Sequence, residues 1–292
     1  MQSADWVGYT CGFLAYFLWG VFPGYFKLID FADPVEILCH RILWSAAFLW
    51  VYLAIRGQIQ ETLEHFRNLR TCIGLFATSA LICSNWLIYT YAVQNQQTIN
   101  ASLGYFINPT VIIILGITFL HERLNVWQGI CMAFAATGIL YLFFTTGELS
   151  WISISLPVTF GIYGLIRKHF PVKSIQGLCI ETTFAFPLAI AYAGFLQFHG
   201  QLSFVHGTAM QKALLGTLGI VTSIPLILFA EGTRRIPYSH MGFLQYIAPT
   251  IQLFIGVLIF AEPFSFPLKL SFGLVWVGLI ILMLGQLTPS RH

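Results

Sequence analysis

Long runs of apolar residues, separated by short polar segments, dominate the chain. A bilayer core of roughly 30 Å requires about 20 apolar residues in a helical crossing, and ten runs approach that length. They span residues 7–28, 35–55, 71–93, 98–120, 125–144, 149–168, 177–196, 212–231, 238–260 and 267–287. Apolar side chains occupy nearly all sides of these helices, which is typical of helices that face lipid or a protein core. The pattern predicts an all-α integral membrane protein with ten transmembrane helices.

The composition agrees with this prediction and excludes other classes of protein. Apolar residues make up 57% of the 292 positions and charged residues 9%, which leaves too little polar surface for a water-soluble fold. The net charge of +3 comes from scattered residues, without the basic cluster that nucleic acid binding requires. The six cysteines occur singly inside apolar runs, so we expect free thiols and no metal site.

Lys and Arg are distributed unequally between alternate loops. One set of loops carries ten: Arg56, Arg67, Arg70, Arg123, Arg167, Lys168, Lys173, Arg234, Arg235 and Arg291. The other set carries three: Lys27, Lys212 and Lys269. Because short cytoplasmic loops are enriched in these residues, we expect both termini to lie in the cytoplasm.

The two halves of the sequence repeat each other. Pro109-Thr110 recurs 140 positions later as Pro249-Thr250. Three further pairs keep this offset: Gly116 and Gly256, Glu122 and Glu262, Gly138 and Gly278. At an offset of 141, Trp19-Gly20 and Lys27 correspond to Phe160-Gly161 and Lys168.

Five helices per half is an odd number, so the second half must enter the membrane from the opposite side. We therefore expect two inverted five-helix units, residues 1–146 and 147–292. In secondary transporters, such inverted repeats form two gates around a site near the membrane midplane and so permit alternating access.

Several polar and aromatic residues fall roughly ten to fourteen positions into their helices, a depth that the helical rise places near the midplane. We predict that eight of them line a central cavity: Trp19, Asn85, Tyr89, Tyr105, Asn108, Tyr163, Gln245 and Tyr246. Pro109, Pro225 and Pro249 lie at similar depths, and the carbonyls that a proline frees are tolerated where they face protein or a water-filled cavity. The alternative is that these residues serve helix packing.

Three ionisable residues inside the apolar runs are candidates for a gating or proton-linked role: His40, Arg41 and Glu181. His40 and Arg41 are near the outer end of their helix and Glu181 is near the cytoplasmic end of its own. His40 and Glu181 are equivalent at the 141 offset, so one hypothesis places them at opposite gates, where protonation biases which side opens. The alternative pairs Arg41 with Glu36 or Asp33, and Glu181 with Arg167 or Lys168. A direct Arg41 to Glu181 pair is not expected, because the helical rise separates them by roughly 15 Å.

Two local patterns concern the membrane and oligomerisation. Residues 56–70 place apolar side chains on one face and charges on the other, as a short interfacial helix would. Gly20 and Gly24 have the spacing that allows close helix contact, either inside the bundle or between the copies of a homodimer.

The chain resembles the drug/metabolite transporter superfamily with paired EamA domains, and within it the RarD proteins named for chloramphenicol sensitivity. The resemblance covers nearly the whole length. The stretches that carry it are Ala15 through Gly20, Glu36 through Arg41, Asn85 through Tyr89, Ala101 through Pro109, Phe160 through Lys168 and Leu244 through Thr250. It implies an EamA-type unit in each half and a ten-helix bacterial inner-membrane permease with both termini inside, but no particular substrate.

These observations predict a secondary transporter that exports small metabolites or amphipathic drug-like compounds. A gradient, with protons as the candidate coupling ion, would supply the energy, because the chain has no phosphate-binding P-loop and we expect no cofactor. An enzyme is not expected, since no catalytic motif such as GxSxG or HExxH occurs. A lipid flippase, a channel and an importer of a small metabolite remain alternatives.

Overall fold

The computed structural model describes residues 5–94, 98–146, 150–259 and 264–287, and every regular element in these ranges is a helix. The elements are α1 (Trp6–Leu28), α2 (Pro34–Ile55), α3 (Ile59–Glu64), the 3-10 helix η1 (His65–Arg67), α4 (Leu69–Gln94), α5 (Thr98–Leu120), α6 (Val126–Thr146), α7 (Trp151–His169), α8 (Ser174–Phe198), α9 (Ser203–His206), α10 (Ala209–Arg235), α11 (Tyr238–Gln245), α12 (Ile247–Leu258) and α13 (Phe266–Leu287). The expected boundary between the two units, at residue 147, lies outside the described ranges. So does Glu262, the expected repeat partner of Glu122.

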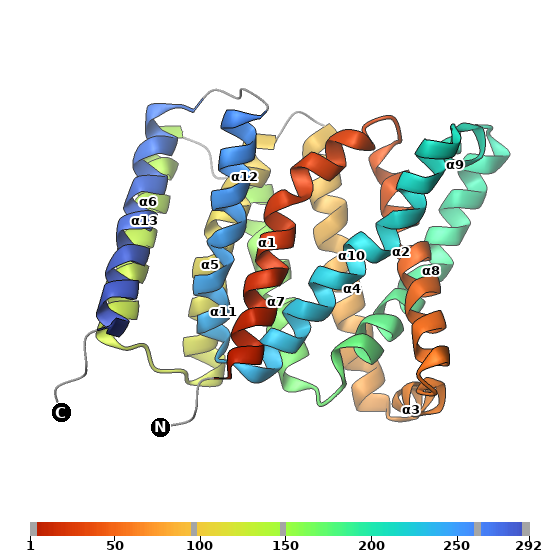
Figure 1. Cartoon of the computed structure of the whole chain (residues 1–292), viewed down its shortest axis with the longest axis horizontal. Helices are drawn as coiled ribbons and strands as arrows, with labels where there is room; N and C mark the ends of the chain where they lie inside the picture. Colours follow the sequence, from red (N-terminus) through yellow and green to blue (C-terminus); the bar gives the residue numbers. More distant parts are fainter. Residues whose placement is uncertain (1–4, 95–97, 147–149, 260–263, 288–292) are drawn as a thin grey trace.

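Seven described helices are long and apolar enough to cross a membrane. They are α2, α4, α6, α8, α10, α13 and the span Tyr238–Leu258, which combines α11 and α12. α5 contributes a shorter apolar stretch, Gly104–Leu120. The long helices run side by side between the two ends of the bundle (Figure 1). The chain is therefore a multi-pass membrane protein.

Capping residues explain where several helices begin. Asp33 accepts hydrogen bonds from the backbone of Val35 and Glu36, and Pro34 supplies the first position of α2. At the start of α10, Thr208 and Gln211 form a capping box. These caps satisfy backbone donors that the helix itself leaves free.

α2 and α8 end in the same way. Gly57 follows α2 with φ of 65°, and Gly200 follows α8 with φ of 67°. Only glycine adopts this left-handed conformation at little cost, and it allows the chain to reverse directly after a helix. The next residues complete the turns, since Gln58 donates to the carbonyl of Leu53 and Gln201 to that of Leu196.

The run predicted as one helix over residues 238–260 is broken at Tyr246. α11 ends at Gln245 and α12 begins at Ile247. Pro249 explains the break, because it lacks the N–H that would bond to the carbonyl of Gln245 and its ring crowds that carbonyl. α5 and α10, by contrast, continue through Pro109 and Pro225.

Helices from the two halves of the chain lie against each other throughout the bundle. The principal neighbours are α6 with α13, α5 with α7, α1 with α10, α2 with α8 and α10, and α5 with α11. Small residues permit the closest approaches. A Cβ on Gly138 would lie 2.9 Å from the carbonyl oxygen of Ser271, and one on Gly278 would lie 3.1 Å from that of Cys131. The two repeated glycines thus occupy one interface, between α6 and α13.

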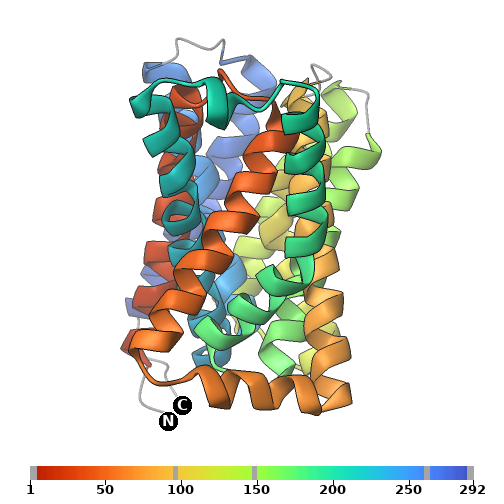
Figure 2. The ribbon, with the colours of Figure 1, turned by 90° about the vertical axis from the view of Figure 1, so that its right-hand side faces the viewer.

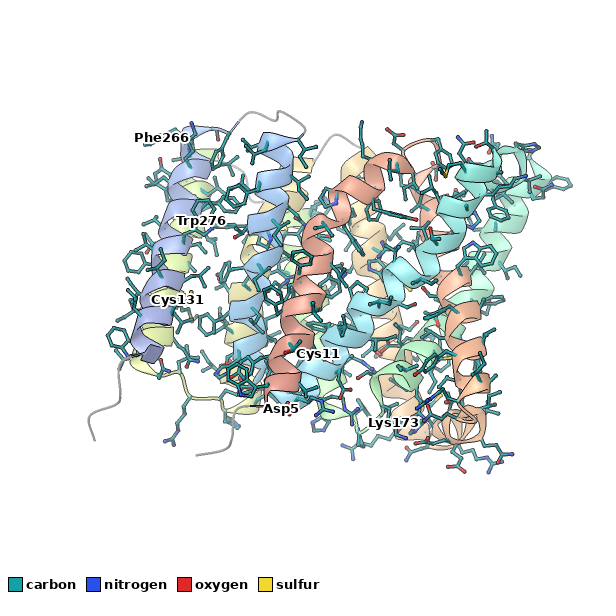
Figure 3. All side chains as sticks on the ribbon, in the orientation of Figure 1. Asp5, Cys11, Cys131, Lys173, Phe266 and Trp276 are labelled. Carbon is teal, nitrogen blue, oxygen red and sulfur yellow. The ribbon has the colours of Figure 1, made fainter. Side chains whose placement is uncertain are left out.

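The segment over residues 56–70 forms α3 and η1, which run across one end of the bundle (Figure 2). Lys173 binds Glu61 of α3 with an Nζ to Oε1 distance of 2.7 Å. This hydrogen bond lowers the pKa of the Glu61 carboxyl. Figure 3 shows Lys173 at this same end and Phe266 at the opposite end.

Candidate substrate cavity

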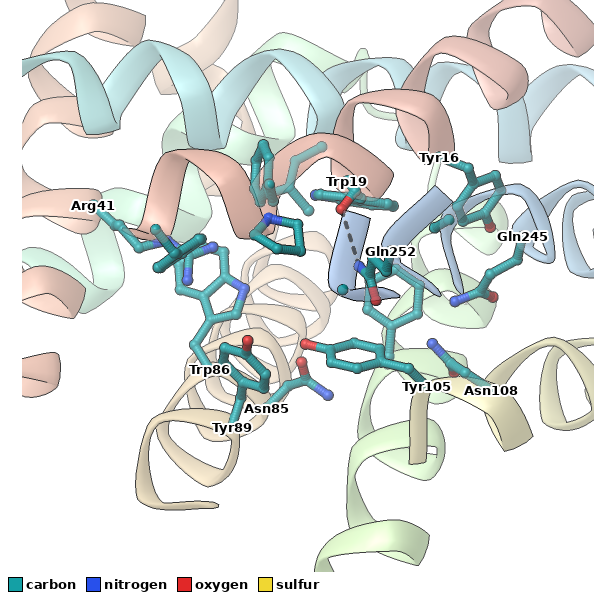
Figure 4. A pocket seen from close by; sticks show the side chains of 17 residues that line it. Tyr16, Trp19, Arg41, Asn85, Trp86, Tyr89, Tyr105, Asn108, Gln245 and Gln252 are labelled. Atoms are coloured by element: carbon teal, nitrogen blue, oxygen red, sulfur yellow. Dashed lines mark hydrogen bonds between the residues drawn. The ribbon is translucent and has the colours of Figure 1, made fainter. Parts of the chain in front are cut away.

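A cavity of about 240 Å³ lies inside the bundle and receives side chains from both halves of the chain. Its walls come from α1, α2, α4, α5, α7, α10, α11 and α12. Eight of the 17 lining residues are aromatic, four carry side-chain amides and one carries a guanidinium (Figure 4). A mostly apolar wall with a few polar groups is typical of small-molecule sites.

α1 forms one wall because its lining residues are spaced three or four positions apart and therefore lie on one face of the helix. Tyr16, Trp19, Pro23 and Phe26 share one helix face and all line the cavity. Trp19 contacts Phe160 of α7 edge to face, with ring centroids 5.5 Å apart. This contact joins a wall from the first half to one from the second.

α4 and α5 form the opposite wall. Asn85 lines the cavity and is fixed by its Nδ2, which donates to the carbonyl of Leu156 at 2.8 Å and to Thr159 Oγ1 at 2.9 Å. Tyr89 and Tyr105 lie beside it with their rings 5.5 Å apart in an edge-to-face contact. Asn85 therefore also ties α4 to α7.

The break between α11 and α12 brings two glutamines to the cavity. Gln245 is the last residue of α11, and Gln252 of α12 donates to the carbonyl of Trp19 at 3.0 Å. Among the described residues, Asn108 Oδ1, Gln245 Oε1 and the Tyr16 hydroxyl are buried without a hydrogen-bond partner. Buried polar atoms without partners are costly, so this part of the wall is not optimised for stability alone.

Arg41 lies on the cavity and does not reach outward to Glu36 or Asp33. Its side chain is 8% exposed. The guanidinium carbon lies 4.1 Å from the centre of the Trp86 ring, and Nε donates to Thr222 Oγ1 at 3.1 Å. Arg41 therefore has an inward position that the sequence analysis did not predict.

Tyr163 and Tyr246 lie outside this cavity lining. Tyr163 is fully buried, and its hydroxyl donates to Glu181 Oε2 at 3.4 Å. Tyr246 stands at the break after α11, where its hydroxyl is 3.1 Å from Thr110 Oγ1. The other six predicted residues line the cavity: Trp19, Asn85, Tyr89, Tyr105, Asn108 and Gln245.

Besides Arg41, three polar lining residues were not predicted from the sequence: Tyr16, Trp86 and Gln252. Tyr16 and Gln252 each lie on the same helix face as a feature that the sequence did indicate, Trp19 and Pro249 respectively. Helical periodicity around those features could have identified both. Trp86 is adjacent to Asn85, and its role depends on the position of Arg41.

His40 and Glu181 contact different elements, away from the cavity lining. His40 Nε2 is 3.5 Å from Glu36 Oε1, and Glu36 accepts a hydrogen bond from the backbone of Phe204 in α9 at 3.0 Å. Glu181 Oε1 is 3.6 Å from Arg167 Nε and accepts from Thr78 at 2.7 Å. α9 and α3 mark opposite ends of the bundle (Figure 1). The gating roles of these residues remain predictions.

Comparison with known proteins identifies the family. Residues 6–144 match the EamA-like transporter family. The chain is also 38% identical over 284 residues to the uncharacterized transporter YojE of Bacillus subtilis (strain 168), with 95% of this chain and 94% of that protein covered. The chain belongs to the EamA-like transporter family.

Other relatives of this EamA-family chain agree with that assignment. It is 34% identical to the protein RarD of Escherichia coli (strain K12) over 285 residues, covering 98% of this chain and 96% of that protein. A crystal structure of a protein that shares 18% identity superposes with a TM-score of 0.68 and covers 95% of this chain and 97% of that one. The latter supports the fold alone. Together the relatives identify a membrane transporter and not an enzyme.

Proposed function

We propose that this protein is a secondary active transporter that exports small metabolites or amphipathic drug-like compounds through the cavity between its helices. The observation that carries the proposal is that both halves contribute to one buried cavity. Trp19 and Tyr105 come from the first half, and Phe160, Gln245 and Gln252 from the second. A site shared by two halves is what alternating access requires, because the halves can then move against each other around a bound solute.

Ten crossings arranged as two inverted five-helix units, residues 1–146 and 147–292, are part of this proposal. Equivalent features in the two halves support it. Gly57 and Gly200 end α2 and α8 with the same left-handed turn, and Gly138 and Gly278 lie in one interface. In this arrangement α11 and α12 act together as one interrupted crossing, and the break near Gln245 faces the cavity. Interrupted helices at the binding site are common in transporters of this kind.

The proposed location is the bacterial inner membrane, with both termini in the cytoplasm. The unequal distribution of Lys and Arg between the loops supports this orientation. Protons are the proposed coupling ion. Glu181 and His40 support this part, because both are buried. Glu181 contacts Arg167 of α7, and His40 contacts Glu36 of its own helix, and protonation would alter both contacts.

A ligand screen with matched variants tests the cavity assignment. The purified protein is heated with amino acids, amines, nucleosides, sugars and chloramphenicol-like compounds, because a ligand of the native state raises the melting temperature by mass action. We expect at least one compound to stabilise the wild type. The affinity should fall roughly tenfold or more in Tyr105→Ala, which removes a wall of the cavity.

Tyr141→Ala is the control, because Tyr141 lies on α6, which contributes no residue to the cavity lining. This variant should bind the same compound as the wild type does. Proteoliposomes that contain the wild type or Tyr141→Ala should show counterflow of that compound, which tests transport in addition to binding. Stabilisation that persists unchanged in Tyr105→Ala would contradict the cavity assignment.

A further inference from the structure

Arg41 carries a buried positive charge that forms no ion pair with any carboxylate in the described part of the chain. It is 8% exposed. The nearest acid on its own helix, Glu36, is 1% exposed and bound to His40 and the backbone of Phe204. Glu181 is bound to Arg167 and Thr78. Neither of these acids forms an ion pair with Arg41.

The position of the guanidinium is fixed by three other helices. Trp86 of α4 stacks with it at 4.1 Å, Phe26 of α1 lies 5.8 Å away, and Thr222 of α10 accepts from Nε. These contacts engage one face of the guanidinium and its Nε. No group in the described residues accepts a hydrogen bond from the two terminal nitrogens, and Arg41 lines the cavity, so these nitrogens can donate to a carboxylate in the fork geometry that matches it.

The remainder of the cavity suits an apolar body rather than a second anion. The rings of Trp86, Tyr89 and Tyr105 adjoin the Arg41 end. Asn108 and Gln245 lie at the other end of the pocket (Figure 4), with their amide nitrogens toward its interior. These amides can hydrogen-bond a neutral polar group of the ligand.

We propose that Arg41 is the anion-recognition residue of the cavity, and that the transported solutes are small organic anions in which a carboxylate is attached to an aromatic or other apolar body. The carboxylate accepts hydrogen bonds from the guanidinium and neutralises it, and the rings enclose the apolar part. A cation in the same place would be repelled, and a neutral isostere would leave the buried charge without a counterion. This inference rests on the proposed function, because it assigns a substrate class to the same cavity.

A set of ligands that share one apolar body and differ in their charged or neutral end group tests the inference on the wild-type protein. Phenylacetate, phenylacetamide and phenethylamine share a ring and a two-carbon unit, and indole-3-acetate with indole-3-acetamide provides a larger pair. Binding to the purified full chain is measured by thermal shift and by displacement of labelled solute. We expect each carboxylate to bind roughly ten- to hundredfold more tightly than its amide, and the amine to bind least.

Variants then assign this preference to Arg41. Arg41→Gln should reduce the acid-to-amide ratio to near one, and Arg41→Lys should retain part of it because the charge remains without the fork. Lys27→Gln is the matched control: it removes one positive charge from an exposed pair with Asp30, and it should keep the wild-type ratio. If Arg41→Gln does not fold, the ligand series on the wild type still tests whether the cavity prefers carboxylates, and Arg41→Lys still tests the contribution of Arg41.

The remaining outcomes distinguish this inference from the proposed function. If amides or amines bind as well as the acids, and their binding is lost in Tyr105→Ala, the cavity is a solute site but the anion proposal is wrong. If phosphatidylglycerol in mixed micelles stabilises the protein through Arg41 and no carboxylate does, the anion is a lipid headgroup and the proposal is also wrong. If no compound of any charge binds, the proposed function itself fails.

Discussion

Glu181 shows how this bundle holds a buried carboxylate. Its two oxygens accept hydrogen bonds from Thr78 of α4 and Tyr163 of α7, and Arg167 of α7 lies 3.6 Å away. These contacts join α8 to two other helices. Loss of the negative charge on Glu181 would leave the buried Arg167 without its counterion and weaken that junction.

Replacement of Glu181 tests whether it links transport to protons. We expect wild-type transport in proteoliposomes to change with pH and Glu181→Gln to lose most of that response, because the amide cannot exchange a proton. The variant should also unfold more readily, since an unpaired Arg167 costs about 3–5 kcal/mol. Transport rates from acidic to neutral pH, with melting temperatures recorded in parallel, separate the two effects.

Glu61→Gln provides the matched control at the membrane surface. Glu61 is exposed and bound to Lys173, and the hydrogen bond from Lys173 lowers the pKa of its carboxyl. We expect this variant to keep the pH response of the wild type. An unaltered pH response in Glu181→Gln would refute the proton role and leave Glu181 with a structural one.

The cavity residues show what sequence can specify at this scale. Counting residues along a helix gives an expected depth, because the rise per residue is constant. Depth alone does not fix which neighbours a side chain meets. Tyr163 turns toward Glu181, and Arg41 turns inward to Trp86. Both orientations depend on contacts between helices distant in sequence.

At the scale of helices, the crossing of α2 and α10 depends on one glycine. A Cβ on Gly219 would collide with the backbone carbonyl of Trp44, and Ser45 Oγ donates to the carbonyl of Gly219 at 3.2 Å. The backbones approach so closely that only glycine fits. Since α2 carries Arg41 and α10 carries Thr222, this crossing also positions the guanidinium.

Two alanine substitutions in α10 test this close approach. Gly219→Ala should destabilise the protein by about 1–3 kcal/mol, because the added methyl group forces the helices apart. Gly216→Ala is the control three residues earlier in the same helix, with no atom within 4 Å of the added Cβ. It should be neutral or stabilising by about 0.5–1 kcal/mol, since alanine favours the helix. Equal melting temperatures of the two variants would argue against a close approach at Gly219.

Helix positions were largely predictable from the sequence, and helix interruptions were not. The apolar runs anticipated the long helices to within a few residues, because lipid imposes both length and composition on a crossing. Pro249 broke its run at Tyr246, whereas α5 and α10 accommodated Pro109 and Pro225. Which proline breaks a helix depends on whether its neighbours satisfy the freed carbonyl, and a single sequence does not contain that information.

For the whole molecule, the charge distribution distinguishes one end of the bundle from the other. Arg56, Lys173, Arg234 and Arg235 gather around one hollow. α3 lies at this end, and α9 lies at the opposite end (Figure 1). Because basic residues are retained on the cytoplasmic side, the end that carries α3 should face the cytoplasm and the end that carries α9 should face outward.

Cysteine labelling in spheroplasts tests this orientation directly. Gln60 of α3 and His206 of α9 are both exposed side chains at the two ends. We expect a membrane-impermeant maleimide to label His206→Cys in intact spheroplasts and Gln60→Cys only after the membrane is opened, with the wild-type cysteines giving the background. The reverse pattern would mean that the chain has the opposite orientation in the membrane, with the α9 end in the cytoplasm. Export through the cavity would then require the solute to enter from the end that carries α9.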